Sequence, residues 1–290
     1  MKTITSLKQM RRLSLSFRRQ GKIIGFVPTM GYLHEGHLSL VKMASKKSNL
    51  VIVSIFVNPT QFGPTEDFRT YPKDLERDKK LLQRAGCDIL FCPSVKQIYP
   101  AGYLTYVNVE QITDKLEGAS RPGHFRGVAT IVAKLFNLVQ PDLAFFGQKD
   151  AQQVLVIKKM VSDLNFFTKI MVAPTLRDQK GLALSSRNSY LNGDEKHQAW
   201  CLYEALQKGR DLVQLGEEDS RVIAASMQEV IQKNPLAKID YIALTDTRKL
   251  EPVDKIKGDV LISVAVRIGS TRLIDNLALR VGKTVYEIKC

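Results

Sequence analysis

The sequence predicts an α/β protein, with a Rossmann-like doubly wound parallel sheet followed by a smaller C-terminal α+β domain. Strand-like and helix-like segments alternate through about the first 175 residues, which is typical of a parallel sheet with helices on both faces. Residues 50–57 form a continuous apolar run, as central parallel strands do because both of their faces are buried. After Tyr190, two helical patterns are followed by three strand patterns, which indicates a second domain of different construction.

The elements of the first domain follow one another in regular order. The expected strands are short apolar runs at 23–27, 50–57, 88–93, 143–146 and 169–172. The expected helices have apolar residues at helical spacing, from residue 38 onward and at 73–85, 128–139 and 152–164. Ligands of such sheets bind at the carboxyl ends of the strands. The segments that follow the strands are therefore the candidate functional segments.

The second domain is expected to contain two helices and then three strands. The helices are expected at 194–215 and 217–233, separated by Gly216, and the strands at 239–244, 260–266 and 273–279. A hairpin turn at 268–271 is expected between the last two strands. The change of pattern near residues 175–187 divides the chain into domains 1–185 and 186–290.

Composition and charge limit the functional classes. The 290 residues are 44% hydrophobic, no apolar run approaches about 18 residues, and residues 1–5 lack a signal peptide's apolar region. The four cysteines, Cys87, Cys92, Cys201 and Cys290, form neither a metal-binding nor a disulfide pattern, so we expect free thiols in a cytoplasmic protein. A net charge of +14 attracts anionic small molecules and permits nucleic-acid binding, but the basic residues are spread without interleaved aromatic residues. We therefore expect neither a nucleic-acid nor a membrane partner.

The first functional motif is PTMGYLHEGH at residues 28–37, between an expected strand and an expected helix. Its imidazoles, His34 and His37, are three residues apart and fall on one side of the first helical turn. Unpaired N–H groups make a helix N-terminus a favourable place for phosphate, and Gly36 leaves room for it. The motif differs from the His-Glu-x-x-His of zinc proteases, and the chain has neither a Walker loop nor a Gly-x-Gly-x-x-Gly. Nucleotide binding is therefore expected at the His-x-Gly-His segment.

Two further segments also have the chemistry of a phosphate site. In FGQKDAQQ (146–153), Gly147 allows close backbone approach and Lys149 suits a phosphate, whereas Asp150 alone is explained as a helix N-cap. In LSSR (184–187), small hydroxyls precede the guanidinium of Arg187, whose charge does not titrate near neutrality. Ser-Ser-Arg is common by chance. It is informative here because it occurs together with His-x-Gly-His, and two such motifs can clamp a triphosphate between them.

Two loops can each be interpreted either as a functional segment or as an ordinary turn or connection. Asn58 and Gln61 offer amide groups to the hydroxyl and carboxylate groups of a small substrate, but Asn before Pro is also a common turn. The glycine-rich loop 117–127 has two interpretations. It binds an anion through Arg121 or Arg126, or it is an ordinary connection.

With these motifs the chain resembles the pantothenate synthetase (pantoate–β-alanine ligase) family of the His-x-Gly-His nucleotidyltransferase superfamily. The resemblance covers nearly the whole chain and rests on PTMGYLHEGH (28–37), FVNPTQF (56–62), RPGHFRGV (121–128), FGQKDAQQ (146–153), GLALSSRN (181–188) and RLIDN (272–276). The family commonly has Glu where Gln148 stands, which weakens any role for that side chain's charge but not for Lys149. The high basic charge is also unusual for the family.

The resemblance implies a ligase that joins pantoate to β-alanine with ATP, through a pantoyl adenylate, and releases AMP and pyrophosphate. It implies four catalytic residues, with His37 as proton donor: His37, His34, Lys149 and Arg187. It implies a pocket for pantoate and β-alanine formed by Gln61, Gln153 and Asn58. It places ATP against Met30, Gly31, Tyr32, Leu33, His34, Glu35, Gly36, His37, Gly147, Gln148, Lys149, Asp150, Leu176, Leu184, Ser185, Ser186 and Arg187.

The resemblance also implies magnesium that arrives with ATP and has no side-chain ligand, no organic prosthetic group, and a homodimer. The C-terminal domain is expected to close over ATP as a lid. One alternative is another adenylyl- or cytidylyltransferase of the superfamily, which would share His34, His37 and Arg187 but need not keep the pantoate pocket. A second alternative is a basic nucleic-acid-binding protein descended from such a fold.

Overall fold

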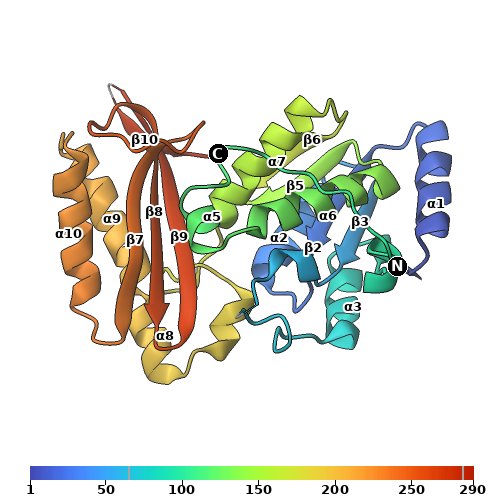
Figure 1. The fold of residues 1–290 in the computed structure, drawn as a ribbon, viewed down its shortest axis with the longest axis horizontal. Helices are drawn as coiled ribbons and strands as arrows, with labels where there is room; N and C mark the ends of the chain where they lie inside the picture. Colours follow the sequence, from blue (N-terminus) through green and yellow to red (C-terminus); the bar gives the residue numbers. More distant parts are fainter. Residues whose placement is uncertain (65, 283) are drawn as a thin grey trace. The chain divides into compact units, whose positions relative to one another are not determined.

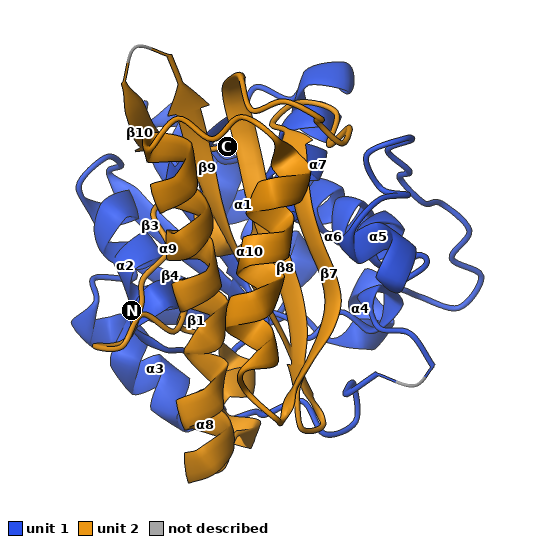
Figure 2. Ribbon diagram, turned by 90° about the vertical axis from the view of Figure 1, so that its left-hand side faces the viewer, with its two compact units in different colours: residues 1–147, 152–173 blue, residues 148–151, 174–290 orange. Residues whose placement is uncertain are grey.

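A computed structural model of the chain describes residues 1–64, 66–282 and 284–290. These residues form two compact units, residues 1–147 with 152–173 and residues 148–151 with 174–290 (Figures 1 and 2). The first unit contains a six-stranded parallel sheet and the second a four-stranded antiparallel sheet, which confirms the predicted fold class. The expected domain boundary, 185/186, lies within the second unit.

The parallel sheet is doubly wound. Its strands are β1 (Lys2–Ile4), β2 (Ile24–Thr29), β3 (Leu50–Ile55), β4 (Ile89–Phe91), β5 (Leu143–Gly147) and β6 (Lys169–Ala173). Their order is β1-β4-β3-β2-β5-β6, so the chain first moves outward from β2 through β3 to β4 and later in the opposite direction from β5 to β6. The switch point of the topology is therefore the β2/β5 pair, where open α/β sheets bind their ligands.

Helices cover both faces of this sheet. Side chains alternate between the two faces along a strand, so adjacent residues of β2 pack against different helices. Val27 belongs to a core cluster that includes residues of α2 (Glu35–Ser45) and α3 (Leu75–Arg84). The adjacent Phe26 instead packs edge-on against Phe136, with ring centroids 6.3 Å apart. Phe136 lies on α6 (His124–Val139), which therefore covers the other face.

Of the remaining five helices that the structure describes in the first unit, two correspond to the helices expected at 128–139 and 152–164, and three were not expected. The five are α1 (Leu7–Arg19), α4 (Val95–Ile98), α5 (Glu117–Ser120), α6 (His124–Val139) and α7 (Ala151–Asp163). The expectation for 117–127 is wrong in that this stretch contains α5 and the first turn of α6. Strand β1 and helix α1 were not predicted. Strand β1 has only three residues and is recognisable only from its pairing with β4.

The second unit packs two long helices on one face of its antiparallel sheet. Its helices are α8 (Gly193–Ala199), α9 (Cys201–Gln214) and α10 (Ser220–Gln232), and its strands are β7 (Ala237–Asp246), β8 (Gly258–Ile268), β9 (Thr271–Val281) and β10 (Val285–Ile288). Alternate residues of β8 share a buried cluster with α9 and α10. The single helix expected at 194–215 is interrupted at Trp200, and β10 was not expected.

Helix α6 approaches the 3₁₀ turn η1 (Pro59–Gln61) closely enough that only glycine fits at residue 127. A Cβ on Gly127 would lie 2.2 Å from the carbonyl oxygen of Thr60 and 2.7 Å from the main-chain nitrogen of Gln61. Both neighbours are backbone atoms, so neither can move aside without moving the turn. Gly127 therefore sets the distance between α6 and the loop that carries Gln61.

We expect Gly127→Ala to destabilise the protein by about 1–3 kcal/mol, because the new methyl group must displace the main chain of η1. The measurement is the free energy of unfolding in urea. Gly193→Ala is the matched control, since a Cβ there meets nothing within 4 Å, and its stability should stay within about 1 kcal/mol of wild type. Equal stability of the two variants would contradict the close approach.

Candidate active site

The turn between β2 and α2 has an unusual backbone that a carboxylate from another element holds in place. Gly31 and Tyr32 both have positive φ, +86° and +50°. The side chain of Asp78, on α3, accepts hydrogen bonds from the N–H groups of Tyr32 (2.7 Å) and Leu33 (2.8 Å). A left-handed conformation is unfavourable for a bulky residue such as Tyr32. These two bonds from Asp78 offset that cost and fix the path of the chain into α2.

The two imidazoles of the His-x-Gly-His segment lie together at the start of α2. His34 is the N-cap, and its Nδ1 accepts from the N–H of Gly36 at 3.1 Å. The Nδ1 of His37 accepts from the N–H of His34 at 3.4 Å, and the ring centroids are 4.1 Å apart. A ring nitrogen that accepts a hydrogen bond carries no proton, so each neutral ring has its proton on Nε2. The pair therefore supplies two Nε2–H donors, which suit phosphate oxygens.

The expectation of unpaired N–H groups at this helix N-terminus is wrong for most of them. The side chain of His34 accepts from N–H groups of the first turn, including that of Gly36, and His37 accepts from that of His34. Asp78 binds the N–H groups of Tyr32 and Leu33 just before the helix. The physical reason is that side chains at the N-cap and N3 positions can accept from the N–H groups that a helix leaves unpaired at its start. The imidazole donors, rather than the main chain, are therefore our candidates for phosphate contact at this turn.

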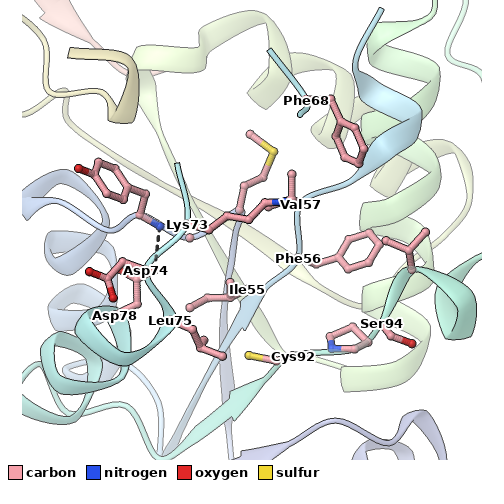
Figure 3. Close-up of a pocket in the computed structure, with 15 residues that line it drawn as sticks. Ile55, Phe56, Val57, Phe68, Lys73, Asp74, Leu75, Asp78, Cys92 and Ser94 are labelled. Atoms are coloured by element: carbon pink, nitrogen blue, oxygen red, sulfur yellow. Dashed lines mark hydrogen bonds between the residues drawn. The ribbon is translucent and has the colours of Figure 1, made fainter. Parts of the chain in front are cut away.

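A cavity of about 330 Å³ lies at the carboxyl ends of β2, β3 and β4, within the usual range for small-molecule sites. Figure 3 shows Asp78 and Phe56 on opposite sides of it. Asp78 is only 1% exposed, and this burial raises the pKa of its carboxyl group, whereas the two N–H donors lower it. Met30 lines the cavity and also accepts a hydrogen bond at its Sδ from Gln61 Nε2 (3.2 Å). Met30 thus connects the cavity with the predicted pantoate residue.

The loop after β3 places Asn58 and Gln61 side by side. The Nδ2 of Asn58 donates to Gln61 Oε1 at 3.0 Å and to the carbonyl oxygen of Gly127 at 3.1 Å. Its Oδ1 accepts from Tyr99 (2.8 Å) and Thr60 (3.0 Å). Asn58 is 1% exposed and Gln61 8%. The ordinary reading of this segment as a simple turn does not account for two buried, hydrogen-bonded amides.

The main chain of Gln61 is held from the other side by a group of three residues, His124, Arg121 and Glu66. His124 Nδ1 lies 2.8 Å from the carbonyl oxygen of Gln61, and Arg121 lies 3.1 Å from His124 Nε2. Arg121 also makes two bonds of 2.7 Å to the carboxylate of Glu66. An arginine can only donate, so His124 accepts at Nε2 and donates from Nδ1. Arg121 also donates directly to the carbonyl oxygen of Gln61 at 3.4 Å, so it holds this main-chain group both by itself and through His124. Arg126 instead stacks on Tyr106 at 4.0 Å.

Two adjacent glutamines on α7 lie in different surroundings. Gln152 is buried, donates to the carbonyl oxygens of Ile112 (2.7 Å) and Lys115 (2.8 Å), and accepts from the N–H of Glu117 (3.0 Å). Its amide therefore anchors the segment before α5. Gln153, the predicted pantoate residue, is half-buried on the next position of the helix.

In the second unit, the segment after Gly147 is fixed by a buried amide pair. Asn276 Nδ2 donates to the carbonyl oxygens of Gln148 (3.1 Å) and Lys149 (2.8 Å), and Gln148 Nε2 donates to Asn276 Oδ1 (3.1 Å). The ammonium of Lys149 lies 3.3 Å from Asp150. The glutamine at 148 therefore has a structural role that needs no charge, since it exchanges hydrogen bonds with another amide.

The Ser-Ser-Arg motif follows a hairpin that an ion pair holds in the second unit. Leu184 N–H donates to the carbonyl oxygen of Leu176 at 2.9 Å, and Arg177 forms a bidentate ion pair with Asp275. Ser185 caps the 3₁₀ turn η3 (Ser186–Tyr190) by accepting from the N–H of Arg187 at 3.3 Å. The hydroxyl of Ser185 thus orients the backbone at the predicted clamp.

Two of the arginines use their charge to order loops. Arg121, which the sequence offered as an anion ligand, is neutralised by Glu66, and this pair holds His124 in place. Arg177, which the sequence did not single out, is paired with a carboxylate and stacks on Tyr203 at 4.2 Å. The net charge of +14 acts over a longer range, where it favours the approach of anionic small molecules.

Neither a metal-binding cluster nor a membrane-spanning helix is found among the described residues. No group of three or more His, Cys, Asp or Glu side chains in the described ranges is placed to hold a metal ion. In the same part of the chain, no helix is both long and apolar enough to cross a membrane.

A family model described as pantoate-beta-alanine ligase matches residues 2–278. The chain belongs to this ligase family. It is 54% identical over 281 residues to the pantothenate synthetase of Moorella thermoacetica, covering 97% of this chain and 99% of that protein. It is similar to the solved structure of pantothenate synthetase from Thermus thermophilus, with a TM-score of 0.91, 45% identity and 96% and 99% of the two chains covered.

A second solved structure of the ligase family holds ligands. The pantoate-beta-alanine ligase of Francisella tularensis, complexed with beta-gamma ATP and beta-alanine, has a TM-score of 0.79 and is 40% identical to this chain. The match covers 95% of this chain and 97% of that one. All six motifs of the sequence resemblance lie within the residues that the ligase family model matches.

Sequence reasoning missed the residues that support the ligase motifs from a distance. Asp78, Tyr99 and Glu66 lie outside every quoted motif, and each holds a motif residue or its neighbour. A lone Asp in an amphipathic helix or a Tyr in an irregular segment carries no local signal. Only its tertiary partner identifies it.

We expect acidification to destabilise the protein through His124. Burial and the charge of Arg121 lower the pKa of His124 from 6.5 to about 4, so between these values the unfolded chain binds a proton that the folded protein does not. Stability is therefore present above about pH 6.5 and is lost as the pH falls toward 4. From about pH 7 to pH 5 the loss should be roughly 2 kcal/mol.

The measurement is urea unfolding at those two pH values. His124→Gln keeps a donor to Gln61 but has no titrating ring, so the difference between the two pH values should shrink by most of that amount. Parallel losses in wild type and variant would show that another group is responsible.

Proposed function

We propose that this chain catalyses the ATP-dependent condensation of pantoate with β-alanine to pantothenate. The family match over residues 2–278 carries the proposal. The paired imidazoles at the switch point of the sheet support it, because they offer two N–H donors where phosphate chemistry is expected. ATP is the energy source, and pantoyl adenylate is the intermediate.

The reaction has two steps. Pantoate first gains the adenylyl group of ATP and then loses it as AMP. The carboxylate of pantoate attacks the α-phosphorus of ATP, an acyl–phosphate bond forms, and pyrophosphate leaves. The amine of β-alanine then attacks the acyl carbon, an amide bond forms, and AMP leaves with the bonding electrons of the acyl–oxygen bond. Negative charge gathers on non-bridging phosphate oxygens in the first step, so fixed donors and cations accelerate it.

The residue roles follow from the chemistry of each side chain. His34 and His37 donate to phosphate oxygens, with His37 as proton donor, and Lys149 and Arg187 supply positive charge. Residues 30–37, 147–150, 176 and 184–187 bind ATP. Gln61 and Gln153 hold pantoate. Asn58 belongs to the same pocket.

Magnesium accompanies ATP in this proposal. It neutralises phosphate charge and keeps mostly phosphate and water ligands, as magnesium bound to nucleotides usually does. We assign it no side-chain ligand and assign the protein no organic prosthetic group.

Other proposed features rest on the sequence and on the resemblance. They are a homodimer, a cytoplasmic location, the absence of nucleic-acid and membrane partners, and closure of the C-terminal domain over ATP. Sedimentation tests the dimer. Measuring DNA binding at two salt concentrations tests the nucleic-acid alternative, because an interface with many phosphate contacts loses affinity steeply as salt rises.

The experiment that tests the function is incubation with ATP, magnesium, pantoate and β-alanine. AMP and pantothenate should appear together, and pantothenate only when all components are present. Adenylyl or cytidylyl transfer to a different small molecule, with no dependence on pantoate, would favour the other transferase reading.

We expect His37→Ala to slow adenylate formation on the order of 100- to 1000-fold while the protein stays folded, because the variant loses a donor to the charged transition state. The measurement is the single-turnover rate of pyrophosphate release. In His37→Ala the N–H of His34 also loses its acceptor. In His37→Asn the side-chain oxygen can accept from this N–H, so that contact is partly restored. A near-normal rate in His37→Ala would remove this side chain from the mechanism.

Gln61→Ala and Gln153→Ala should weaken pantoate binding more than ATP binding, because neutral amides match hydroxyl and carboxylate groups. Each lost hydrogen bond to a charged substrate costs roughly 1.5–3 kcal/mol. Calorimetric titration with pantoate and with an ATP analogue separates the two. The neighbouring Gln152→Ala is not a suitable control, because its amide anchors another segment. Loss of ATP affinity with unchanged pantoate affinity would overturn the pocket.

A further inference from the structure

Every hydrogen-bonding position of Asn58 is occupied within the protein. Its amide nitrogen has two donors, which go to Gln61 and Gly127, and its carbonyl oxygen has two acceptor positions, which receive Tyr99 and Thr60. The side chain is also 1% exposed. An amide that is saturated and buried has no group left for a substrate, so its influence must pass through one of these neighbours.

The orientation of the Asn58 amide is set by a main-chain group. The carbonyl oxygen of Gly127 can only accept a hydrogen bond, so the Asn58 atom 3.1 Å away must be the nitrogen. The Asn58 oxygen then faces the two hydroxyls, which can donate. Amide oxygen and nitrogen are otherwise hard to distinguish by position, and here the acceptor-only neighbour removes the ambiguity.

The orientation of the Gln61 amide is set in turn by Asn58. The second N–H of Asn58 points at the Gln61 side chain, 3.0 Å away, so the Gln61 atom there must be the oxygen. The Gln61 nitrogen is consequently the other terminal atom, and it donates to the Sδ of Met30 at 3.2 Å. A thioether is a weak acceptor. That N–H bond is thus easily exchanged for one to a carboxylate or hydroxyl oxygen.

Tyr99 is suited to hold this arrangement at all ordinary pH values. Burial raises the pKa of its phenol to about 12, so the hydroxyl keeps its proton and remains a donor to Asn58. Its ring is packed between Phe56, with centroids 6.3 Å apart, and Tyr103, at 5.0 Å. The position of the hydroxyl therefore depends on the ring packing and not on the substrate.

We propose that Asn58 and Tyr99 are positioning residues that fix the Gln61 side chain so that it presents N–H donors, and not its carbonyl oxygen, to an acceptor oxygen of pantoate. The inference rests on the proposed function for the identity of the substrate. It assigns Asn58 no direct substrate contact and gives Tyr99, which lies outside every motif, a role in substrate binding. Gly127 contributes both its main-chain oxygen and the close approach that brings it to Asn58.

The first test is Tyr99→Phe, which removes one donor and keeps the ring. The KM for pantoate should rise about 3- to 10-fold, with kcat and the KM for ATP within about 2-fold of wild type. Tyr103→Phe is the matched control, because Tyr103 packs in the same aromatic group and makes no hydrogen bond to Asn58 in the described structure. Its KM for pantoate should not change. An unchanged KM in Tyr99→Phe, or an equal rise in both variants, would overturn the inference.

The second test is a double-mutant cycle with Gln61→Ala. If Asn58 and Tyr99 act through Gln61, then Tyr99→Phe should have no further effect on the KM for pantoate in the Gln61→Ala background. Additive effects would show that Tyr99 acts by another route and would overturn the relay. A folded state in each variant is checked by its melting temperature, so a general loss of structure is not mistaken for coupling.

The third test uses Asn58→Asp, which replaces the amide nitrogen by an acceptor. The Gln61 amide must then rotate to donate to the new carboxylate and turn its oxygen toward pantoate, so the KM for pantoate should rise by at least about 10-fold. In the Gln61→Ala background this substitution should change the KM far less, whereas a direct contact between Asn58 and pantoate would keep the full effect. The wild-type assay separates the two proposals. Without pantoate-dependent AMP formation by wild type, the proposed function fails, whereas normal wild-type activity with additive cycles overturns only this inference.

Discussion

The Asp78 carboxylate accepts two hydrogen bonds from main-chain N–H groups, and the rest of the candidate site in the first unit depends on them. Asp78 lies on α3 and reaches the turn after β2, where Gly31 and Tyr32 have positive φ. A buried carboxylate is unfavourable unless it is hydrogen-bonded, and here it accepts from Tyr32 and Leu33 and lies 3.6 Å from Arg77. His34 and α2 follow at once, so the placement of both imidazoles depends on this turn.

Main-chain groups also decide which atoms the side chains of the candidate site present. Backbone N–H groups bind Nδ1 of His34 and His37, which leaves the ring protons on Nε2. A backbone carbonyl orients Asn58, and Asn58 in turn orients Gln61. Donors that are fixed before the substrate arrives need no reorganisation during the reaction, which is the physical basis of electrostatic stabilisation in enzymes.

The sequence by itself determined the α/β class, most elements and the candidate functional segments. Apolar periodicity is a local property, and His34, His37, Gln61 and Arg187 stand in motifs whose residues are close in the chain. Where local signals were weak the predictions failed, as for the short strand β1 and for the break at Trp200. The candidate site residues are therefore named from sequence alone, and both their membership of the site and their roles stay predictions.

Only the tertiary structure decided how those residues are oriented. Asp78 and the turn that it holds lie on different elements, and Tyr99, Asn58 and the carbonyl of Gly127 come from three separate segments. The N–H groups expected to be unpaired at the start of α2 are instead bound by the side chains of His34 and His37, whose orientation the sequence does not give. A hydrogen bond is short-ranged and directional, so which atom of an amide or imidazole faces a substrate is settled only when the segments around it are packed.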